Sequence, residues 1–82
     1  MAIDIKDTAD KVIGIVVEKL DIDPSIVQTS ATLQDLGADS LDMVEIVMKV
    51  EETFDIEIND EAIAKLHNLQ EFINYIHELR TR

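Results

Sequence analysis

Apolar residues recur with a helical period near the start of the chain, from about Asp4 to Leu20. Counting about 100° per residue places six of them on one face of a helix; they are Ile5, Ala9, Val12, Ile13, Val16 and Leu20. Gly14 falls on the opposite face, where glycine costs on the order of 1 kcal/mol relative to alanine but disturbs no core contact. The pattern therefore predicts a first helix with one buried side.

The helical period is lost between Asp21 and Asp39. A structureless connection of that length is uncommon in a compact domain, so we expect apolar side chains to hold it against the rest of the molecule. Asp23 followed by Pro24 is typical of a cap with proline in the first helical turn, which predicts a short turn of helix here. The apolar side chains available to hold the connection are Ile22, Ile26, Val27, Leu33 and Leu36.

A second helix is predicted from about Ser40 to Phe54, with Asp39 as its N-cap and Asp42 placed to complete a capping box. Asn59 or Asp60 then opens a short third helix that runs to about Leu66. A fourth helix follows a cap at Asn68, and its apolar residues again share one face. These are Leu69, Phe72, Ile73, Ile76 and Leu79, with Tyr75 at the flank.

The predicted fold is all-α: a four-helix bundle with a long loop between the first two helices and a short third helix. With 82 residues, of which 46% are apolar, the chain is close to the lower size limit for one self-sufficient core. We therefore expect residues 1–82 to form a single domain. Only two glycines and one proline occur, and no repeat interrupts the pattern.

The second helix has more apolar residues than one core face needs. A complete buried stripe is already formed by Met43, Ile46, Val47, Val50 and Phe54. Three apolar residues remain on another side, surrounded by acids; the apolar ones are Leu41, Val44 and Met48, and the acids are Glu45, Glu51 and Glu52. Scattered exposed apolar residues are ordinary on proteins, but an apolar stripe framed by carboxylates is typical of a transient docking surface.

Composition excludes several classes of function. The net charge of −11 disfavours nucleic acid and anionic membrane surfaces as partners, and complementary partners should present Lys and Arg. No signal peptide is apparent, and no run approaches the roughly 20 apolar residues that span a bilayer. The chain has no cysteine, and its two histidines are expected at a helix end (His67) and in solvent (His77), so neither a metal site nor catalysis is predicted.

Residues 35–42 read Asp-Leu-Gly-Ala-Asp-Ser-Leu-Asp and place Ser40 at the start of the second helix. No histidine or lysine stands near Ser40 in the sequence, and the Gly-x-Ser-x-Gly elbow of serine hydrolases is absent. Ser40 is therefore expected to be modified by another protein rather than to act as a nucleophile in its own catalysis. This run, with residues 43–48 and 54–58, resembles the attachment motif of free-standing acyl carrier proteins of fatty acid synthesis, and looser similarity covers most of the chain.

The resemblance implies a carrier, not an enzyme. A 4′-phosphopantetheine arm would be attached to Ser40, between Asp39 and Leu41, by a phosphopantetheinyl transferase (holo-ACP synthase) that takes it from coenzyme A. Fatty acid synthase enzymes and acyltransferases with basic surfaces would then recognise the second helix of a cytoplasmic monomer without membrane insertion. The matching recognition positions are Asp39, Leu41, Val44, Glu45, Met48, Glu51 and Glu52.

Acyl chains carried on the arm fold back between the helices in this family. The resemblance assigns the lining of that cavity to Val12, Leu33, Ile46, Val50, Ile58, Ile63, Leu66, Phe72 and Tyr75. Thr32 stands where a bulkier apolar residue is common, and Phe72 stands where a small one is common. The shape of the cavity is therefore expected to differ from that of other family members.

The sequence leaves open two alternatives to a carrier of fatty acid synthesis. A specialised carrier for polyketide, peptide or aminoacyl groups would share the arm but serve other enzymes. An unmodified acidic adaptor would use the second helix only to bind proteins, and the intact mass of the protein would separate it from any carrier.

Overall fold

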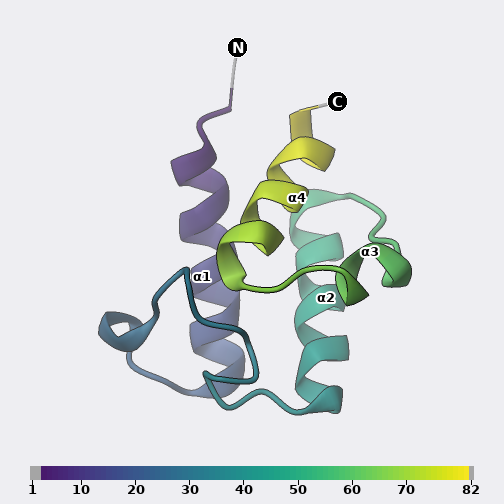
Figure 1. Cartoon of the computed structure of the whole chain (residues 1–82). Coiled ribbons are helices and arrows are strands. Elements are labelled where there is room, and N and C mark those ends of the chain that lie inside the picture. Colours follow the sequence, from purple (N-terminus) through teal and green to yellow (C-terminus); the bar gives the residue numbers. More distant parts are fainter. Residues whose placement is uncertain (1–2, 82) are drawn as a thin grey trace.

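In the computed structural model, which describes residues 3–81, the chain folds into helices joined by loops (Figure 1). The elements are α1 (Ile5–Leu20), the 3-10 turn η1 (Pro24–Ile26), α2 (Ser40–Phe54), α3 (Asp60–Ala64) and α4 (Leu69–Thr81). Helix α1 packs against both α2 and α4. The first turn of α1 and the last turn of α4 lie at one end of the molecule, and α2 begins at the other end (Figure 1). The predicted all-α fold with a long first connection and a short third helix is confirmed.

Side chains close by in the sequence cap the helices, and the caps predicted for α3 and α4 are among them. Asp4 caps α1 by accepting a bond from the Lys6 amide, and Asn59 caps α3 through the Glu61 amide at 2.8 Å. Asn68 accepts from the Glu71 amide at 2.9 Å in the first turn of α4. Such caps satisfy amide groups that have no partner inside a helix.

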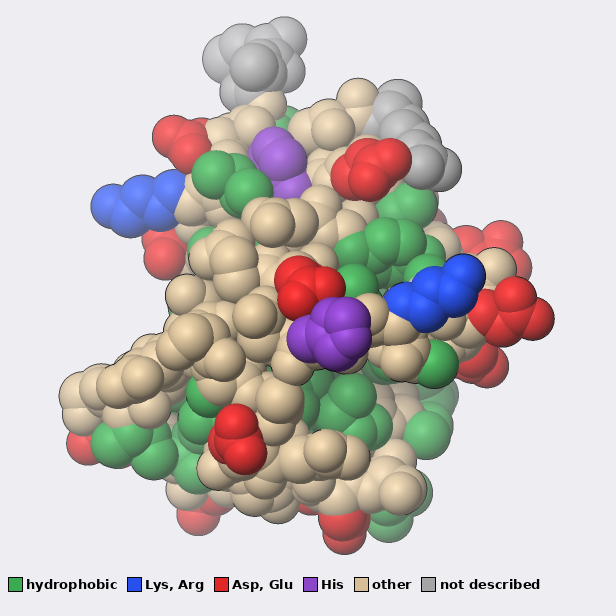
Figure 2. Space-filling view, viewed as in Figure 1, with side chains coloured by type: hydrophobic (Ala, Val, Ile, Leu, Met, Phe, Trp, Pro, Cys, Tyr) green, Lys and Arg blue, Asp and Glu red, His purple; other side chains and the backbone are tan. Residues whose placement is uncertain are grey.

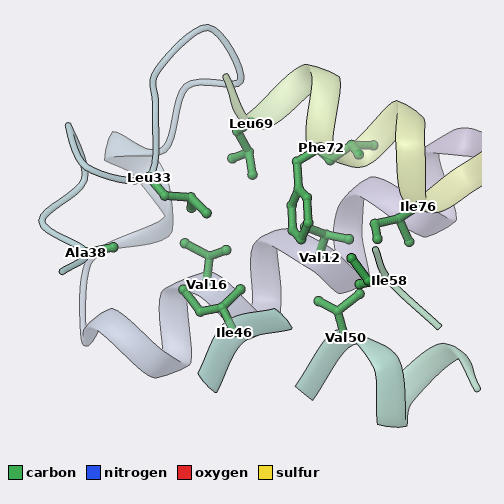
Figure 3. Close-up of a cluster of buried hydrophobic side chains, with 11 residues drawn as sticks. Val12, Val16, Leu33, Ala38, Ile46, Val50, Ile58, Leu69, Phe72 and Ile76 are labelled. Atoms are coloured by element: carbon green, nitrogen blue, oxygen red, sulfur yellow. The ribbon is translucent and has the colours of Figure 1, made fainter. Parts of the chain in front are cut away.

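The core is a cluster of apolar side chains from α1, α2, α4 and the loops between them (Figure 3). Phe72 points from α4 into this cluster, among aliphatic side chains of the other elements (Figure 3). The buried members are Val12, Val16, Leu33, Ala38, Ile46, Val50, Ile58, Leu69, Phe72, Ile73 and Ile76. Gly14 faces open space, as predicted, because a Cβ added there would meet nothing within 4 Å.

The prediction that Ile5 belongs to the buried face of α1 is wrong. Ile5 is 41% exposed, and the buried line of α1 is instead Thr8, Val12 and Val16. Ile5 lies in the first turn, where a helix end has neighbours on fewer sides. Ile26 was likewise expected to hold the long loop, but it is 57% exposed on the 3-10 turn.

The long loop between α1 and α2 is held in place by backbone hydrogen bonds in addition to its apolar side chains. The Leu69 amide donates to the Ala31 carbonyl at 2.9 Å, and the Gln70 amide donates to the Thr29 carbonyl at 2.8 Å. The loop thus supplies partners for free amides in the first turn of α4. Val27, Leu33 and Leu36 complete the attachment by packing on the core.

Polar side chains join α1 to α4 at the end of the molecule away from Ser40. Thr8 is fully buried, and its Oγ1 lies 2.9 Å from both His77 Nδ1 and Arg80 Nη1. Arg80 Nη1 also donates to Asp7 at 3.0 Å, and its guanidinium lies 4.5 Å from the ring centroid of Phe54. His77 is therefore half-buried and hydrogen-bonded, so its predicted place in solvent is wrong.

Candidate attachment site and docking face

A rigid turn leads the chain to Ser40. The Asp35 amide donates to Thr32 Oγ1 at 2.9 Å, and the Thr32 amide donates to the Asp35 carboxylate at 3.2 Å. Gly37 then adopts a φ of +101°, which a residue with a side chain rarely adopts. Ala38 is buried in the core and anchors the chain two residues before the serine.

Ser40 is the first residue of α2 and is exposed. The capping box predicted around it is confirmed, because the Asp42 amide donates to Asp39 at 2.8 Å and the Asp39 amide donates to Asp42 at 3.2 Å. Within residues 3–81 no hydrogen bond engages the Ser40 hydroxyl, and nothing covers it. The backbone at this position is held firmly while the hydroxyl stays accessible to another protein.

The apolar residues left over from the core stripe of α2 are exposed, as the helical wheel predicts. Leu41 is 65% exposed, Val44 is 56% exposed and Met48 is 53% exposed. Together with Ser40 they form one continuous side of the helix, which we call the docking face. Acidic side chains are spread over the side of the molecule seen in Figure 2, where basic ones are sparse.

The three glutamates around the docking face differ in their surroundings. Glu45 pairs with Lys19 on α1. Glu51 accepts a hydrogen bond from the Ile58 amide at 2.9 Å and so helps to hold the loop after α2. Glu52 is exposed. Sequence periodicity could not separate these three environments, because both contacts involve residues outside the helix.

An open pocket of about 440 Å³ lies between α2, α3, α4 and the loop before α2. Four residues predicted to line an acyl cavity do line this pocket: Leu33, Ile63, Leu66 and Phe72. Met43 also lines it, although the helical wheel placed Met43 in the core stripe. Met43 lies three residues after Ser40 and on the same side of α2, and this spacing is the sequence signal that could have identified it as a pocket residue.

The other predicted cavity residues do not line this pocket. Val12, Ile46 and Val50 are fully buried in the core, and Ile58 is 7% exposed. Tyr75 is half-buried, and its hydroxyl accepts a bond from the Asn59 amide at 3.3 Å. The four aliphatic residues thus belong to the core, and Tyr75 packs against it.

No group of three or more His, Cys, Asp or Glu side chains that could hold a metal ion occurs in residues 3–81. In the same residues, no helix is both long and apolar enough to cross a membrane.

Comparison with known families gives the class of protein. Residues 10–76 match the family described as the phosphopantetheine attachment site. The chain is therefore a carrier whose prosthetic group is a covalently attached phosphopantetheine. An exposed hydroxyl with no competing hydrogen bond among residues 3–81, on a fixed first turn, fits this group. The helix N-terminus beside it also favours the negative charge of a phosphate.

Individual relatives narrow the class further. The chain is 44% identical over 73 residues to the acyl carrier protein of Zymomonas mobilis, covering 88% of this chain and 94% of the relative. It is 50% identical over 66 residues to that of Campylobacter concisus (79% and 86% covered) and 51% identical over 67 residues to that of Bdellovibrio bacteriovorus (80% and 86%). The chain belongs to the acyl carrier proteins, which are carriers of fatty acid synthesis and not enzymes.

Proposed function

We propose that Ser40 is the attachment residue and that the chain carries acyl intermediates of fatty acid biosynthesis as thioesters on the arm it bears. The observation that carries this proposal is the exposed Ser40 hydroxyl at the capped start of α2, beside the docking face. The phosphopantetheine supplies the thiol that a chain without cysteine lacks. The thiol forms the thioester, and the protein supplies position and recognition.

Attachment needs a partner enzyme because this chain provides no base for the serine. Within residues 3–81 no histidine, lysine or carboxylate is hydrogen-bonded to the Ser40 hydroxyl. When the Ser40 Oγ–phosphorus bond forms, the pyrophosphate bond of coenzyme A breaks and adenosine 3′,5′-bisphosphate leaves, and the hydroxyl proton is taken up by a base outside this chain, at the active site of the phosphopantetheinyl transferase. Asp39 and Asp42 contribute by holding the first turn of α2 in place.

The docking face is proposed as the surface that the transferase, fatty acid synthase enzymes and acyltransferases share. Leu41, Val44 and Met48 supply exposed apolar area at its centre. Glu45, Glu51, Glu52 and Asp39 supply negative charge at its edge, which favours partners with basic surfaces and speeds their encounter. We expect the chain to act as a cytoplasmic monomer and as one domain.

The open pocket is proposed to receive the acyl chain. Its apolar walls include Leu33, Met43, Ile63 and Leu66, and Met43 connects it to the side of α2 that carries Ser40. Phe72 lies at its inner wall and is only 4% exposed, so its ring limits the depth that an acyl chain can reach without rearrangement. Burial of alkyl groups there would stabilise the loaded form by the hydrophobic effect.

Intact-mass spectrometry tests the proposal. Incubation of the apo protein with coenzyme A and a phosphopantetheinyl transferase should add one phosphopantetheine, and Ser40→Ala should abolish the addition. The variant should keep its helical circular dichroism and melting temperature, since the capping residue Asp39 is unchanged. Addition to the alanine variant, or to Ser25 or Ser30, would refute Ser40 as the attachment residue.

A further inference from the structure

Lys19 brings a positive charge from another helix to the edge of the docking face. It lies in the last turn of α1, where a cation also suits the negative end of the helix dipole. Its ammonium pairs with the Glu45 carboxylate on α2, and the two side chains are 37% and 38% exposed. The pair is thus accessible to a partner and is not part of the buried core.

Glu45 borders all three apolar residues of the docking face. It directly follows Val44, and it lies one helical turn from Leu41 on one side and from Met48 on the other. A partner that covers these three exposed apolar residues must therefore approach the Glu45 carboxylate. Lys19 already holds that carboxylate.

The same two residues line an open groove of about 430 Å³ between α1 and α2, together with Ile15, Glu18, Ile46 and Lys49. The groove gives the Lys19 side chain space into which it can withdraw when another cation takes its place. The Lys19–Glu45 pair can therefore open without any movement of the helices.

We propose that Lys19 is a specificity-determining residue that competes with the basic residues of partner enzymes for Glu45. This inference rests on the proposed function of α2 as the docking face. Partners that present an arginine, which binds a carboxylate through two parallel bonds, displace Lys19 more readily than partners that present a lysine. Partners that use Glu52 instead of Glu45 avoid the competition.

The test compares Lys19→Gln with Lys6→Gln, which makes the same change in net charge at the other end of α1. The assay is the kcat/KM of a phosphopantetheinyl transferase for each apo protein at low and at high salt. Lys19→Gln should raise kcat/KM by about two- to fivefold over Lys6→Gln at low salt, through a lower KM, because exposed ion pairs have about this strength. About 0.5 M sodium chloride should remove the difference, since exposed charges are then screened.

The same comparison made in a second variant separates the effect of the Lys19–Glu45 pair from the general effect of net charge. In Glu45→Gln, the further change Lys19→Gln should alter kcat/KM no more than Lys6→Gln does, because the carboxylate for which Lys19 competes is gone. Circular dichroism should show the same helical content for all variants.

The outcomes separate the inference from the proposed function. Equal effects of Lys19→Gln and Lys6→Gln would overturn the inference, because net charge alone would then account for both. A fall in kcat/KM for Lys19→Gln would overturn it too, since Lys19 would then itself contact the enzyme. The same gain in the Glu45→Gln background would also refute it. Failure of the parent chain to accept the arm would instead overturn the proposed function, and this inference with it.

Discussion

Replacing Thr8 by valine should destabilise the bundle although the two side chains have nearly the same shape. Thr8 is fully buried, and its hydroxyl lies between His77 and Arg80 of α4. Arg80 can only donate, so the hydroxyl accepts from Arg80, and it shares a second hydrogen bond with His77 Nδ1 whose direction is set by the His77 tautomer. With valine at this position, His77 Nδ1 would lose its hydrogen-bond partner. Arg80 Nη1 would lose its bond to Thr8 and keep its bond to Asp7.

The magnitude follows from these two lost bonds. Leaving a buried polar group unsatisfied costs about 1–3 kcal/mol, and the added methyl group returns part of this by apolar burial. We expect a net loss of about 1–2 kcal/mol in the free energy of unfolding. A chain of this length has a total of about 4–12 kcal/mol, so the loss is a large fraction. It corresponds to a fall in melting temperature of about 4–16 °C, at about 4–8 °C per kcal/mol in a domain of this size.

The assay is thermal unfolding at neutral pH, followed by circular dichroism. Thr53→Val is the matched control, because Thr53 is exposed on α2 and its substitution makes the same chemical change on a helix surface. The control should change the melting temperature by little. A melting temperature of Thr8→Val equal to that of the control would show that the hydroxyl contributes nothing and would refute the role assigned to these bonds.

Two further predictions concern acid stability and the pocket. The hydrogen bond from Arg80, followed by that from Lys11, lowers the pKa of Asp7 below its ordinary value of 3.8. Asp7 therefore stabilises the fold above pH 3.8 and loses this effect as pH falls through its lowered pKa. Asp7→Asn should melt below the parent at pH 7 and converge with it in acid, and an equal decrease in Asp10→Asn would contradict this. Loading the arm with an octanoyl group should raise the melting temperature by several degrees. Leu66→Gln, in the pocket, should remove this increase, whereas Leu41→Gln, on the docking face, should keep it. An increase that is unchanged in Leu66→Gln would exclude the pocket as the binding site of the acyl chain.

Local chemistry made the helix starts predictable. Each cap joins residues that lie two or three positions apart, so Asp39 and Asn68 could be assigned from the sequence alone, and the third cap could be limited to Asn59 or Asp60. The exposed side of α2 was predictable for a related reason. A helix of that length needs only one apolar stripe for the core, and the surplus apolar residues must face elsewhere.

Contacts between distant segments were not predictable. His77 was expected in solvent because nothing in its own helix explains a buried position, and its partner Thr8 comes from the other end of the chain. The Lys19–Glu45 pair has the same origin, since it depends on how α1 packs against α2. Of the residues that the family resemblance assigns to an acyl cavity, four line the open pocket, and the others do not, because a residue's place inside the bundle does not say whether the space beside it is filled.

The end of the bundle away from Ser40 contributes mainly to stability, and the end that carries Ser40 contributes mainly to recognition. At the end away from Ser40, Arg80 joins Asp7 and Thr8 of α1 and lies over Phe54, the last residue of α2. This arrangement holds three helices together without any residue of the docking face. The start of α2 is fixed mainly by backbone bonds to capping side chains, so its own side chains stay exposed. Changes to the docking face should consequently alter partner binding with little effect on unfolding, whereas changes around Arg80 should do the reverse.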